Sequence, residues 1–164
     1  MKKENFSLAG LCDMHSSHIK CLPPIFTSYG LRPRFTGEIV TLKLYEDNAL
    51  LKKKILEDGN GKVLVIDGCG SPHCALIGDQ VVVQAIKNGW EGFVINGYIR
   101  DSKQINILPI GIKALGTCPI KSSKKSFGYD NMTINIGGTD IHPGDYVYAD
   151  EDGVLISHQW FLDD

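Results

Sequence analysis

The chain has 164 residues, 43% of them hydrophobic and 22% charged, which fits one globular domain over residues 1–164 with a sizeable core. A net charge of −2 and an isoelectric point near 6.2 argue against direct nucleic-acid binding and against attraction to an anionic membrane. No apolar run is long enough to span a bilayer, and "MKKENFSLAG" lacks the apolar core of a signal peptide. We therefore expect a cytoplasmic protein whose five cysteines are free thiols.

Two helices and two strands are predicted in the first part of the chain. Residues 6–19 can form a short helix capped by Ser7, and the alternating, β-branched residues 37–46 predict a strand. Asp47 can cap a helix over 48–58 that ends at Gly59 and Gly61. The continuously apolar run 62–68 is typical of a strand that is covered on both faces.

The next segment is predicted as a loop over 69–78, a helix over 79–89 and a buried strand over 91–99. Val81 to Val83 alone would suggest a strand, but the length of the segment and the stop at Gly89 favour a helix. The rest is read as short strands, with a turn in "DEDG": 111–117, 132–138 and 144–157. This order predicts an α/β domain with a mixed sheet.

Two strand ends in this pattern are candidates for a site, because ligands of α/β folds bind beyond the carboxyl ends of strands. One end leads through the loop to the helix at Gly78, and the other is "VINGYIRD". If the two strands are neighbours, residues 78–81 and the pair Arg100–Asp101 converge on one crevice. In an extended strand, Arg100 and Asp101 point to opposite faces and need not pair.

The residue types at these positions suit a small acid and a metal. The helix start offers free N–H groups to a carboxylate, and Gly78 allows close approach of the backbone. Arg100 supplies a fork of donors for a carboxylate or an enolate oxygen. Asp101 is a hard oxygen ligand for Mg²⁺ or Mn²⁺, and Asp79 is a second, water-mediated carboxylate candidate.

These residues resemble a known family. Asp79, followed after twenty residues by Arg100–Asp101, is similar to the D-x20-R-D signature of class II pyruvate aldolases. "VLVIDGCGS", "GWEGFVINGYIRD" and "YADEDGVLIS" extend the resemblance over nearly the whole chain. The superfamily includes aldolases of 4-hydroxy-4-methyl-2-oxoglutarate, some of which decarboxylate oxaloacetate, and the RraA-like regulators of ribonuclease E activity. The resemblance is strongest to the short, regulator-like members.

The resemblance implies a swivelling β/β/α fold, assembled as a homotrimer or a dimer of trimers. It assigns Gly78, Asp79, Gln80 and Val81 to the loop that binds the substrate carboxylate, Arg100 to the substrate and Asp101 to the metal. A divalent metal cation (Mg²⁺ or Mn²⁺) and Arg100 would polarise the carbonyl of a small 2-oxo acid, and both would stabilise the pyruvate enolate. The base for the C4 hydroxyl stays open, with Asp79 acting through a water on the metal as one candidate.

Some positions leave alternatives open. Gln104 stands where aldolase members often have an acidic residue, Cys69 interrupts the usual "DGGGS", and Glu151 or Asp152 could serve as the acid that aldolases borrow from a neighbouring subunit. A non-catalytic regulator that binds and inhibits a ribonuclease E-type partner is the alternative function. For Cys69, His73 and Cys74 we favour a loop that lines the crevice over a zinc site, and for "KSSKKS" we favour a solvated loop. Arg32 and Arg34 can equally well line the pocket or lie on the surface.

Overall fold

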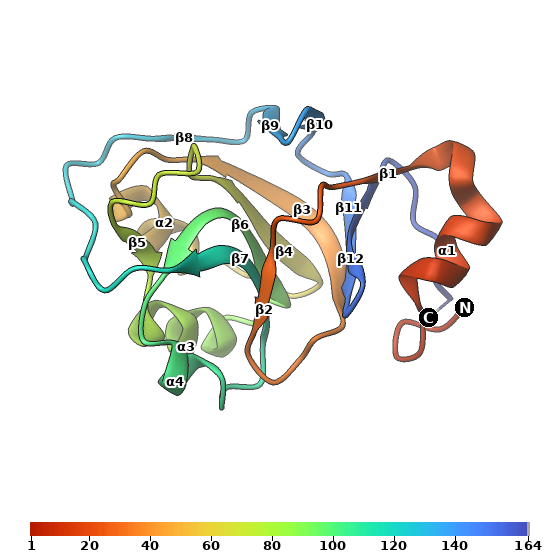
Figure 1. Cartoon of the computed structure of the whole chain (residues 1–164), viewed down its shortest axis with the longest axis horizontal. Coiled ribbons are helices and arrows are strands. Elements are labelled where there is room, and N and C mark those ends of the chain that lie inside the picture. The colour runs from red at the N-terminus through yellow and green to blue at the C-terminus, as the bar shows by residue number, and fades with distance from the viewer. Residues whose placement is uncertain (164) are drawn as a thin grey trace.

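The computed structural model describes residues 1–163 and has the mixed α/β architecture that the sequence predicts (Figure 1). In the described chain, eight strands follow the order β1-β12-β11-β3-β4-β6-β7-β2, while β5 pairs with β6 and β8 with β3. The bounds are β1 Ile19–Cys21, β2 Thr27–Tyr29, β3 Phe35–Lys43, β4 Lys62–Asp67, β5 Ala75–Ile77, β6 Gly92–Ile99, β7 Gly111–Thr117, β8 Tyr129–Asp130, β11 Tyr146–Asp150 and β12 Gly153–Ser157. A separate hairpin consists of β9 Ile134–Ile136 and β10 Thr139–Ile141.

The centre of the sheet is parallel and covered on both faces. Strands β3, β4, β6 and β7 run parallel, and Leu64 of β4 lies between Val40 and Phe93. Leu64 and Ile66 pack on one side in a core with residues of the helices, while Val63 and Val65 pack on the other with β9 and β11–β12. Burial on both faces explains why the run 62–68 is continuously apolar.

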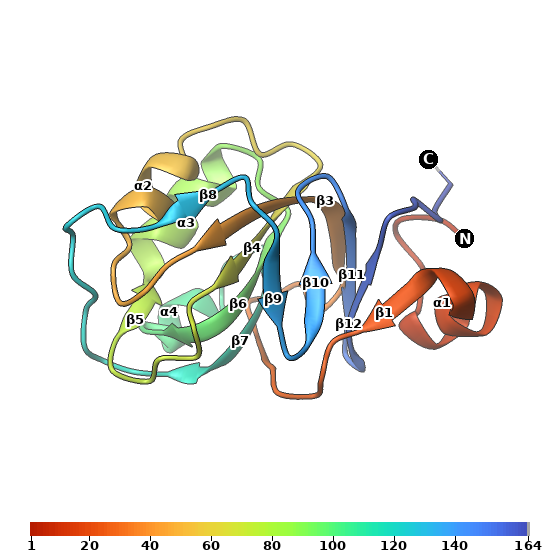
Figure 2. The same ribbon diagram turned by 90° about the horizontal axis from the view of Figure 1, so that it is seen from above.

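The helices gather at two ends of the molecule. Helices α2 (Ala49–Lys54), α3 (Asp79–Lys87) and α4 (Ser102–Ile105) lie at one end, and α1 (Leu8–His15) lies at the other beside both termini (Figures 1 and 2). Ser7 caps α1 as predicted, since its Oγ accepts the Gly10 N–H at 3.2 Å. The segment after Gly78 is a helix despite its three valines, and it buries Val81, Val82 and Ala85.

The differences from the predicted elements concern short strands and helix ends. The first helix stops at His15, a 3₁₀ turn covers Ser16–His18, and the following residues form β1. The predicted loop 69–78 contains β5, and the second predicted helix ends at Lys54. Strands β1, β2, β5, β8 and β10 have two or three residues each, which is too short for the alternation that predicts a strand.

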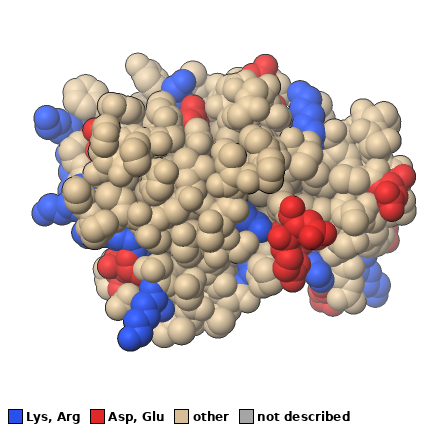
Figure 3. Space-filling view, viewed as in Figure 1, with Lys and Arg blue, Asp and Glu red and all other residues tan. Residues whose placement is uncertain are grey.

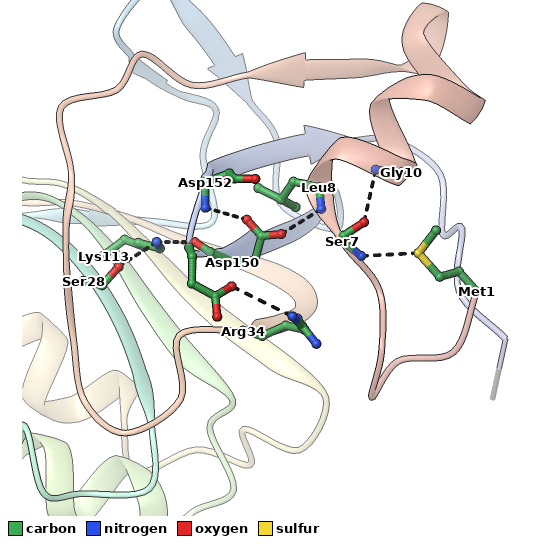
Figure 4. A network of polar contacts seen from close by, with 10 residues as sticks. Met1, Ser7, Leu8, Gly10, Ser28, Arg34, Lys113, Asp150 and Asp152 are labelled. Carbon is green, nitrogen blue, oxygen red and sulfur yellow. Dashed lines mark hydrogen bonds and ion pairs between the residues drawn. The ribbon is translucent and has the colours of Figure 1, made fainter.

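A buried polar network fixes α1 to the sheet (Figure 4). The Asp150 carboxylate accepts the N–H of Leu8 at 2.8 Å and that of Asp152 at 2.8 Å, which closes the predicted turn between β11 and β12. Lys113 Nζ donates to Ser28 Oγ at 2.7 Å and to the Asp150 carbonyl. Burial lowers the pKa of Lys113. No helix in the described chain is long and apolar enough to cross a membrane.

Candidate active site

The topology brings the two predicted strand ends together. Strands β4 and β5 both pair in parallel with β6, and Arg100 N–H donates to the carbonyl of Ile77 at 3.0 Å. Gly78 and Arg100 therefore leave the sheet side by side. Both residues line a crevice of about 160 Å³. It is lined by all six residues that the sequence singles out: Gly78, Asp79, Gln80, Val81, Arg100 and Asp101.

The expectation that Arg100 and Asp101 point to opposite faces is wrong. The regular strand ends at Ile99, and Asp101 adopts a left-handed conformation with φ 57° and ψ 36°. As a result both side chains face the crevice, with Arg100 Nε 3.8 Å from Asp101 Oδ2. Among the described residues this is the only ion pair of Arg100, and 41% of its side chain is exposed. Most of its donors are thus free for a ligand.

Asp101 also lies at the start of α3. Its Oδ2 accepts the N–H of Asp79 at 3.2 Å, and a Cβ on Gly78 would lie 2.5 Å from the same oxygen. Gly78 has an ordinary extended φ of −130°, so glycine is required here for space rather than for conformation. The N-cap residue Gly78 has no side chain to cap α3, and Asp101 accepts only the first N–H, which leaves the later N–H groups of the first turn for a bound anion.

Further residues of the crevice were not singled out from the sequence. It is lined by Asn48, Lys52, Lys121, Ser122 and Lys124. The segment "KSSKKS" is a solvated loop as predicted, with Ser122 its one buried residue, and it also forms one wall of the crevice. Three buried side-chain atoms of the described residues lack a hydrogen-bond partner, and two of them, Asn48 Oδ1 and Ser122 Oγ, belong to this crevice. Buried polar atoms are usually paired, so this pair indicates a place for a polar ligand.

Asp47 holds the lysine-rich loop against the crevice. Its Oδ2 accepts the Ser123 hydroxyl at 3.2 Å and the N–H of Lys125, while its Oδ1 accepts the N–H of Ala49 at 3.0 Å. Burial raises the pKa of the Asp47 carboxyl, but the hydrogen bonds outweigh it and the pKa lies below its usual range. Asn48 rather than Asp47 holds the N-cap position of α2, but Asp47 still accepts the N–H of Ala49, the first residue of the helix. No local pattern indicates the contact of Asp47 with residues 123–125, which are more than seventy positions away.

The crevice carries excess positive charge. Four cationic side chains (Lys52, Arg100, Lys121 and Lys124) face two carboxylates (Asp79 and Asp101). Burial, together with the nearby Lys124 and Arg100, lowers the pKa of Lys52. Figure 3 shows Lys and Arg side chains along the edge of the molecule where α2, β5 and the following loops lie in Figure 1. Such a field attracts a small dianion.

The donor set of the crevice fits a hard divalent cation. Asp101 keeps Oδ1 free of other contacts in the described residues, and Asp79 adds a second carboxylate. One or two carboxylates are what Mg²⁺ uses when it keeps several waters. Cys69, His73 and Cys74 do not converge: Cys74 is buried, and His73 Nδ1 contacts Glu46 Oε1 at 2.7 Å.

The other residues whose roles the sequence analysis left open lie outside the crevice. Arg32 and Arg34 line a separate hollow together with Lys3 and Glu91. Glu151 lies 3.9 Å from Arg34 Nη2 and, like Asp152, does not line the crevice of its own chain. Gln104 is exposed on α4 and does not line the crevice either. An acid contributed by Glu151 or Asp152 would have to act on another copy of the chain.

Comparison with known proteins identifies the family. The family described as RraA-like, Aldolase/RraA, matches residues 8–156. The chain belongs to the RraA-like family. A relative from Dechloromonas aromatica is 51% identical over 93% of this chain and 96% of its own, and one from Arabidopsis thaliana is 49% identical over 91% and 93%. Both have the name "Putative 4-hydroxy-4-methyl-2-oxoglutarate aldolase", numbered 2 in Arabidopsis.

Solved structures of RraA-like proteins have the same fold. The RNA-processing inhibitor RraA from Thermus thermophilis superposes with a TM-score of 0.91 and 37% identity, over 94% of each chain. A protein from Geobacillus kaustophilus superposes with a TM-score of 0.93 and 40% identity, over 95% of this chain and 97% of that one. Its name is S-adenosylmethionine:2-dimethylmenaquinone methyltransferase. Names within the family thus span an aldolase, an inhibitor and a methyltransferase.

Proposed function

We propose that this chain is a divalent-metal-dependent aldolase that cleaves 4-hydroxy-4-methyl-2-oxoglutarate to pyruvate and also decarboxylates oxaloacetate. The observation that carries the proposal is the crevice in which Arg100, Asp101 and the start of α3 face one small space. The names of the relatives from Dechloromonas and Arabidopsis support the same reaction class.

The proposed roles follow from where each group lies. The free N–H groups at the start of α3 bind the C1 carboxylate, and the Arg100 guanidinium donates to the C2 carbonyl oxygen. Asp101, with Asp79 in support, would hold Mg²⁺ or Mn²⁺, which supplies positive charge beside the C2 oxygen. When the C3–C4 bond breaks, its electron pair moves to the C2 oxygen and leaves a pyruvate enolate. Arg100 stabilises that charge, an effect of about 10²–10³ in rate for one such donor.

The two substrates differ in what leaves C3. Oxaloacetate loses carbon dioxide, which needs no base. Cleavage of the hydroxy acid needs removal of the C4 hydroxyl proton, after which C4 becomes the carbonyl of a second pyruvate. The unpartnered acceptor Asn48 Oδ1 is placed to receive a hydrogen bond from a hydroxyl in the crevice, because Asn48 Nδ2 is held by the Leu76 carbonyl at 3.0 Å. Asp79 is the candidate for the base.

The charge and size of the crevice support a small dicarboxylate. Four cationic groups against two carboxylates suit a substrate with two negative charges, as both proposed acids have. A volume of about 160 Å³ is well below the roughly 300–1,000 Å³ of pockets for drug-sized ligands. S-adenosylmethionine is a ligand of that larger kind, so the crevice gives methyl transfer no support.

The test is pyruvate release from each acid with Mg²⁺ and with EDTA, compared with Arg100→Ala, Asp101→Ala and a metal-only blank, since metal ions alone decarboxylate oxaloacetate. We expect turnover in the wild type that is lost in both variants and in EDTA. Asn48→Ala should impair cleavage of the hydroxy acid more than decarboxylation. Turnover that persists in EDTA, or full activity in Arg100→Ala, would reject the proposal.

A second candidate function is inhibition of a ribonuclease E-type endonuclease. The observation in its favour is the similarity to the Thermus RNA-processing inhibitor over 94% of both chains. Inhibition would use the protein surface and leave the crevice without a role. The discriminating measurement is the rate of RNA cleavage by a purified endonuclease of this type with added wild-type protein and with Arg100→Ala. Equal inhibition by the two, together with no lyase turnover, would favour the regulator.

We also propose that the chain assembles as a homotrimer or a dimer of trimers. Three large aromatic side chains are more than half exposed, with values of 60% for Tyr45, 67% for Phe127 and 68% for Tyr129. Tyr45, Phe127 and Tyr129 line one shallow hollow with Leu44 and Cys69, and exposed apolar patches often mark protein contacts. Light scattering should give three or six times the chain mass of 18.0 kDa. A monomer at micromolar concentration would reject the assembly.

A further inference from the structure

A cluster of two imidazoles and a carboxylate lies away from the crevice. His142 follows β10, Asp145 precedes β11 and His158 follows β12. Strands β11 and β12 pair, and Ile141 of β10 packs in the same core cluster as Val147 and Ile156. Each residue offers one ligand atom within 4.8 Å of the others. In the described chain no other group of three or more His, Cys, Asp or Glu residues has this arrangement. None of the three lines the candidate active site.

Asp145 is a fixed and buried member of the cluster. Only 7% of its side chain is exposed, and its Oδ2 accepts the N–H of His142 at 2.9 Å. The backbone is held as well, because Asp145 N–H donates to the His142 carbonyl at 3.1 Å and Ile39 N–H donates to the Asp145 carbonyl at 2.7 Å. Oδ1 is left to face His158, whose Nδ1 lies 2.6 Å away. The carboxylate is therefore positioned before any ligand arrives.

The two imidazoles are arranged for a shared ligand. Thr133 Oγ1 contacts His142 Nδ1 at 2.8 Å, which leaves Nε2 as the other ring nitrogen and fixes the ring orientation, as partners of metal-binding histidines do. The rings of His142 and His158 are stacked with centroids 5.5 Å apart. His158 has 63% of its side chain exposed, so its ring can turn. A hollow of about 20 Å³ lies against Asp145 and His158 and is large enough for one water or ion. His18, Lys20 and Asp140 also line it, whereas His142 does not.

We propose that His142, Asp145 and His158 bind a divalent transition metal of the Zn²⁺ type, with water completing the shell. Two imidazoles and one carboxylate are an established ligand set for zinc, whose ligands lie at about 2.0–2.2 Å. Ligand atoms of one tetrahedral zinc are about 3.3 Å apart, so atoms that lie within 4.8 Å of one another need to close by at most roughly 1.5 Å. Rotation of the exposed His158 ring supplies that movement. The alternative is a plain His158–Asp145 hydrogen bond, for which the second histidine is incidental.

Such a metal would add a link between the turn before β11 and the end of β12, which already pair through Tyr146 and Ser157. His142 and Asp145 stand in the turn between β10 and β11, while His158 stands where the chain leaves β12 for the C-terminal segment beside α1. The ion would tie the β9–β10 hairpin to the end of β12. We therefore expect bound Zn²⁺ to raise the unfolding temperature without any need for the active-site metal.

The test is titration of the metal-free protein with Zn²⁺ against a chromophoric chelator near pH 7.5. We expect one equivalent that is retained in Asp101→Ala, and an affinity that falls about 10-fold or more in His142→Ala and in His158→Ala. His73→Ala is the matched control, since it also removes one imidazole paired with a carboxylate, and its affinity should be unchanged. Zn²⁺ should raise the unfolding temperature of the wild type and of His73→Ala, but not of His158→Ala.

Imidazole NMR signals provide a readout that does not depend on variants. In the wild type, one equivalent of Zn²⁺ should shift the signals of His142 and His158 and leave those of His15 and His73 unchanged. Equal Zn²⁺ affinity in the wild type and His158→Ala would overturn the site. So would the absence of any shift at these two histidines after one equivalent.

Discussion

Replacing Gly78 by alanine should damage the candidate active site while leaving the fold intact. The new Cβ would lie 2.5 Å from Asp101 Oδ2, whereas an ordinary C···O contact is about 3.3 Å, so the carboxylate must move by about 0.8 Å. Gly78 has φ −130°, which alanine adopts without strain. The variant loses the 3.2 Å hydrogen bond from Asp79 N–H, about 1 kcal/mol, and gains a similar amount from reduced freedom of the unfolded chain.

The effect on activity should be far larger. Metal sites tolerate deviations of only about 0.2 Å, and a misplacement near 1 Å costs about 100-fold in rate. That factor corresponds to about 2.7 kcal/mol of transition-state stabilisation. The assays are pyruvate release from oxaloacetate and Mn²⁺ binding by electron paramagnetic resonance. The Asp101→Ala variant gives the activity expected when the side chain that binds the metal is missing.

The matched control is Gly10→Ala in α1, at the other end of the molecule. Its Cβ would lie 2.9 Å from Met1 Cε and 3.0 Å from Ser7 Oγ, a similar local crowding without any link to the crevice. We expect wild-type activity and Mn²⁺ affinity in this variant. A folded Gly78→Ala protein with wild-type turnover and Mn²⁺ affinity would refute the placement of the metal at Asp101.

Three further predictions concern charge and stability. Lys52→Gln and Lys124→Gln should each raise KM for oxaloacetate about 5-fold with little change in kcat, because one charged contact to the substrate is lost. Lys103→Gln on α4, which does not line the crevice, should leave KM unchanged. Asp47 has a folded pKa below its unfolded value near 3.9, so its contribution to stability is present above about pH 4 and is lost as the pH falls through the folded pKa. Asp47→Asn should therefore lower the free energy of unfolding by about 1.5–3 kcal/mol at pH 7 and by progressively less in acid, as measured by urea unfolding. Asp150→Ala removes the acceptor of the Leu8 and Asp152 N–H groups, which should lower the free energy of unfolding by about 3 kcal/mol and the unfolding temperature by about 6–12 °C. The control Asp163→Ala should change the unfolding temperature little, because the exposed ion pair of Asp163 with the N-terminus is weak. An Asp150→Ala protein as stable as Asp163→Ala would contradict the role of the network in Figure 4.

The central part of the fold was predictable because local pattern and burial agree there. The apolar run of β4 and the long strand β6 have the composition of strands covered on both faces, and Gly78 and Gly89 mark the ends of α3. Strands β1, β2, β5, β8 and β10 were not predictable, since two or three residues have no period. Their pairing is set by the partner strand, as for Ala75 and Ile77 beside β6.

In the candidate site, too, the residues set by local pattern were predictable and those set by long-range contacts were not. Residues 78–81 and Arg100–Asp101 were predictable because they follow strand ends that share one edge of the sheet. The opposite-face orientation of Arg100 and Asp101 was wrong because a left-handed residue directly after the strand breaks the alternation. Lys121, Ser122 and Lys124 were missed because long-range contacts with Asp47 and Ala75 bring their loop to the crevice. His142, Asp145 and His158 were missed for the same reason, since a strand hairpin separates the second histidine from the other two residues.

The most direct test of the proposed chemistry is exchange of the methyl protons of pyruvate with D₂O, followed by proton NMR. This exchange reports the pyruvate enolate that both proposed reactions share, and it does not depend on which acid is the natural substrate. With Mg²⁺ present we predict loss of the methyl signal well above the rate of a Mg²⁺ blank, and a return to the blank rate in Arg100→Ala and in EDTA. Exchange at the blank rate in folded, metal-loaded wild-type protein would contradict the account.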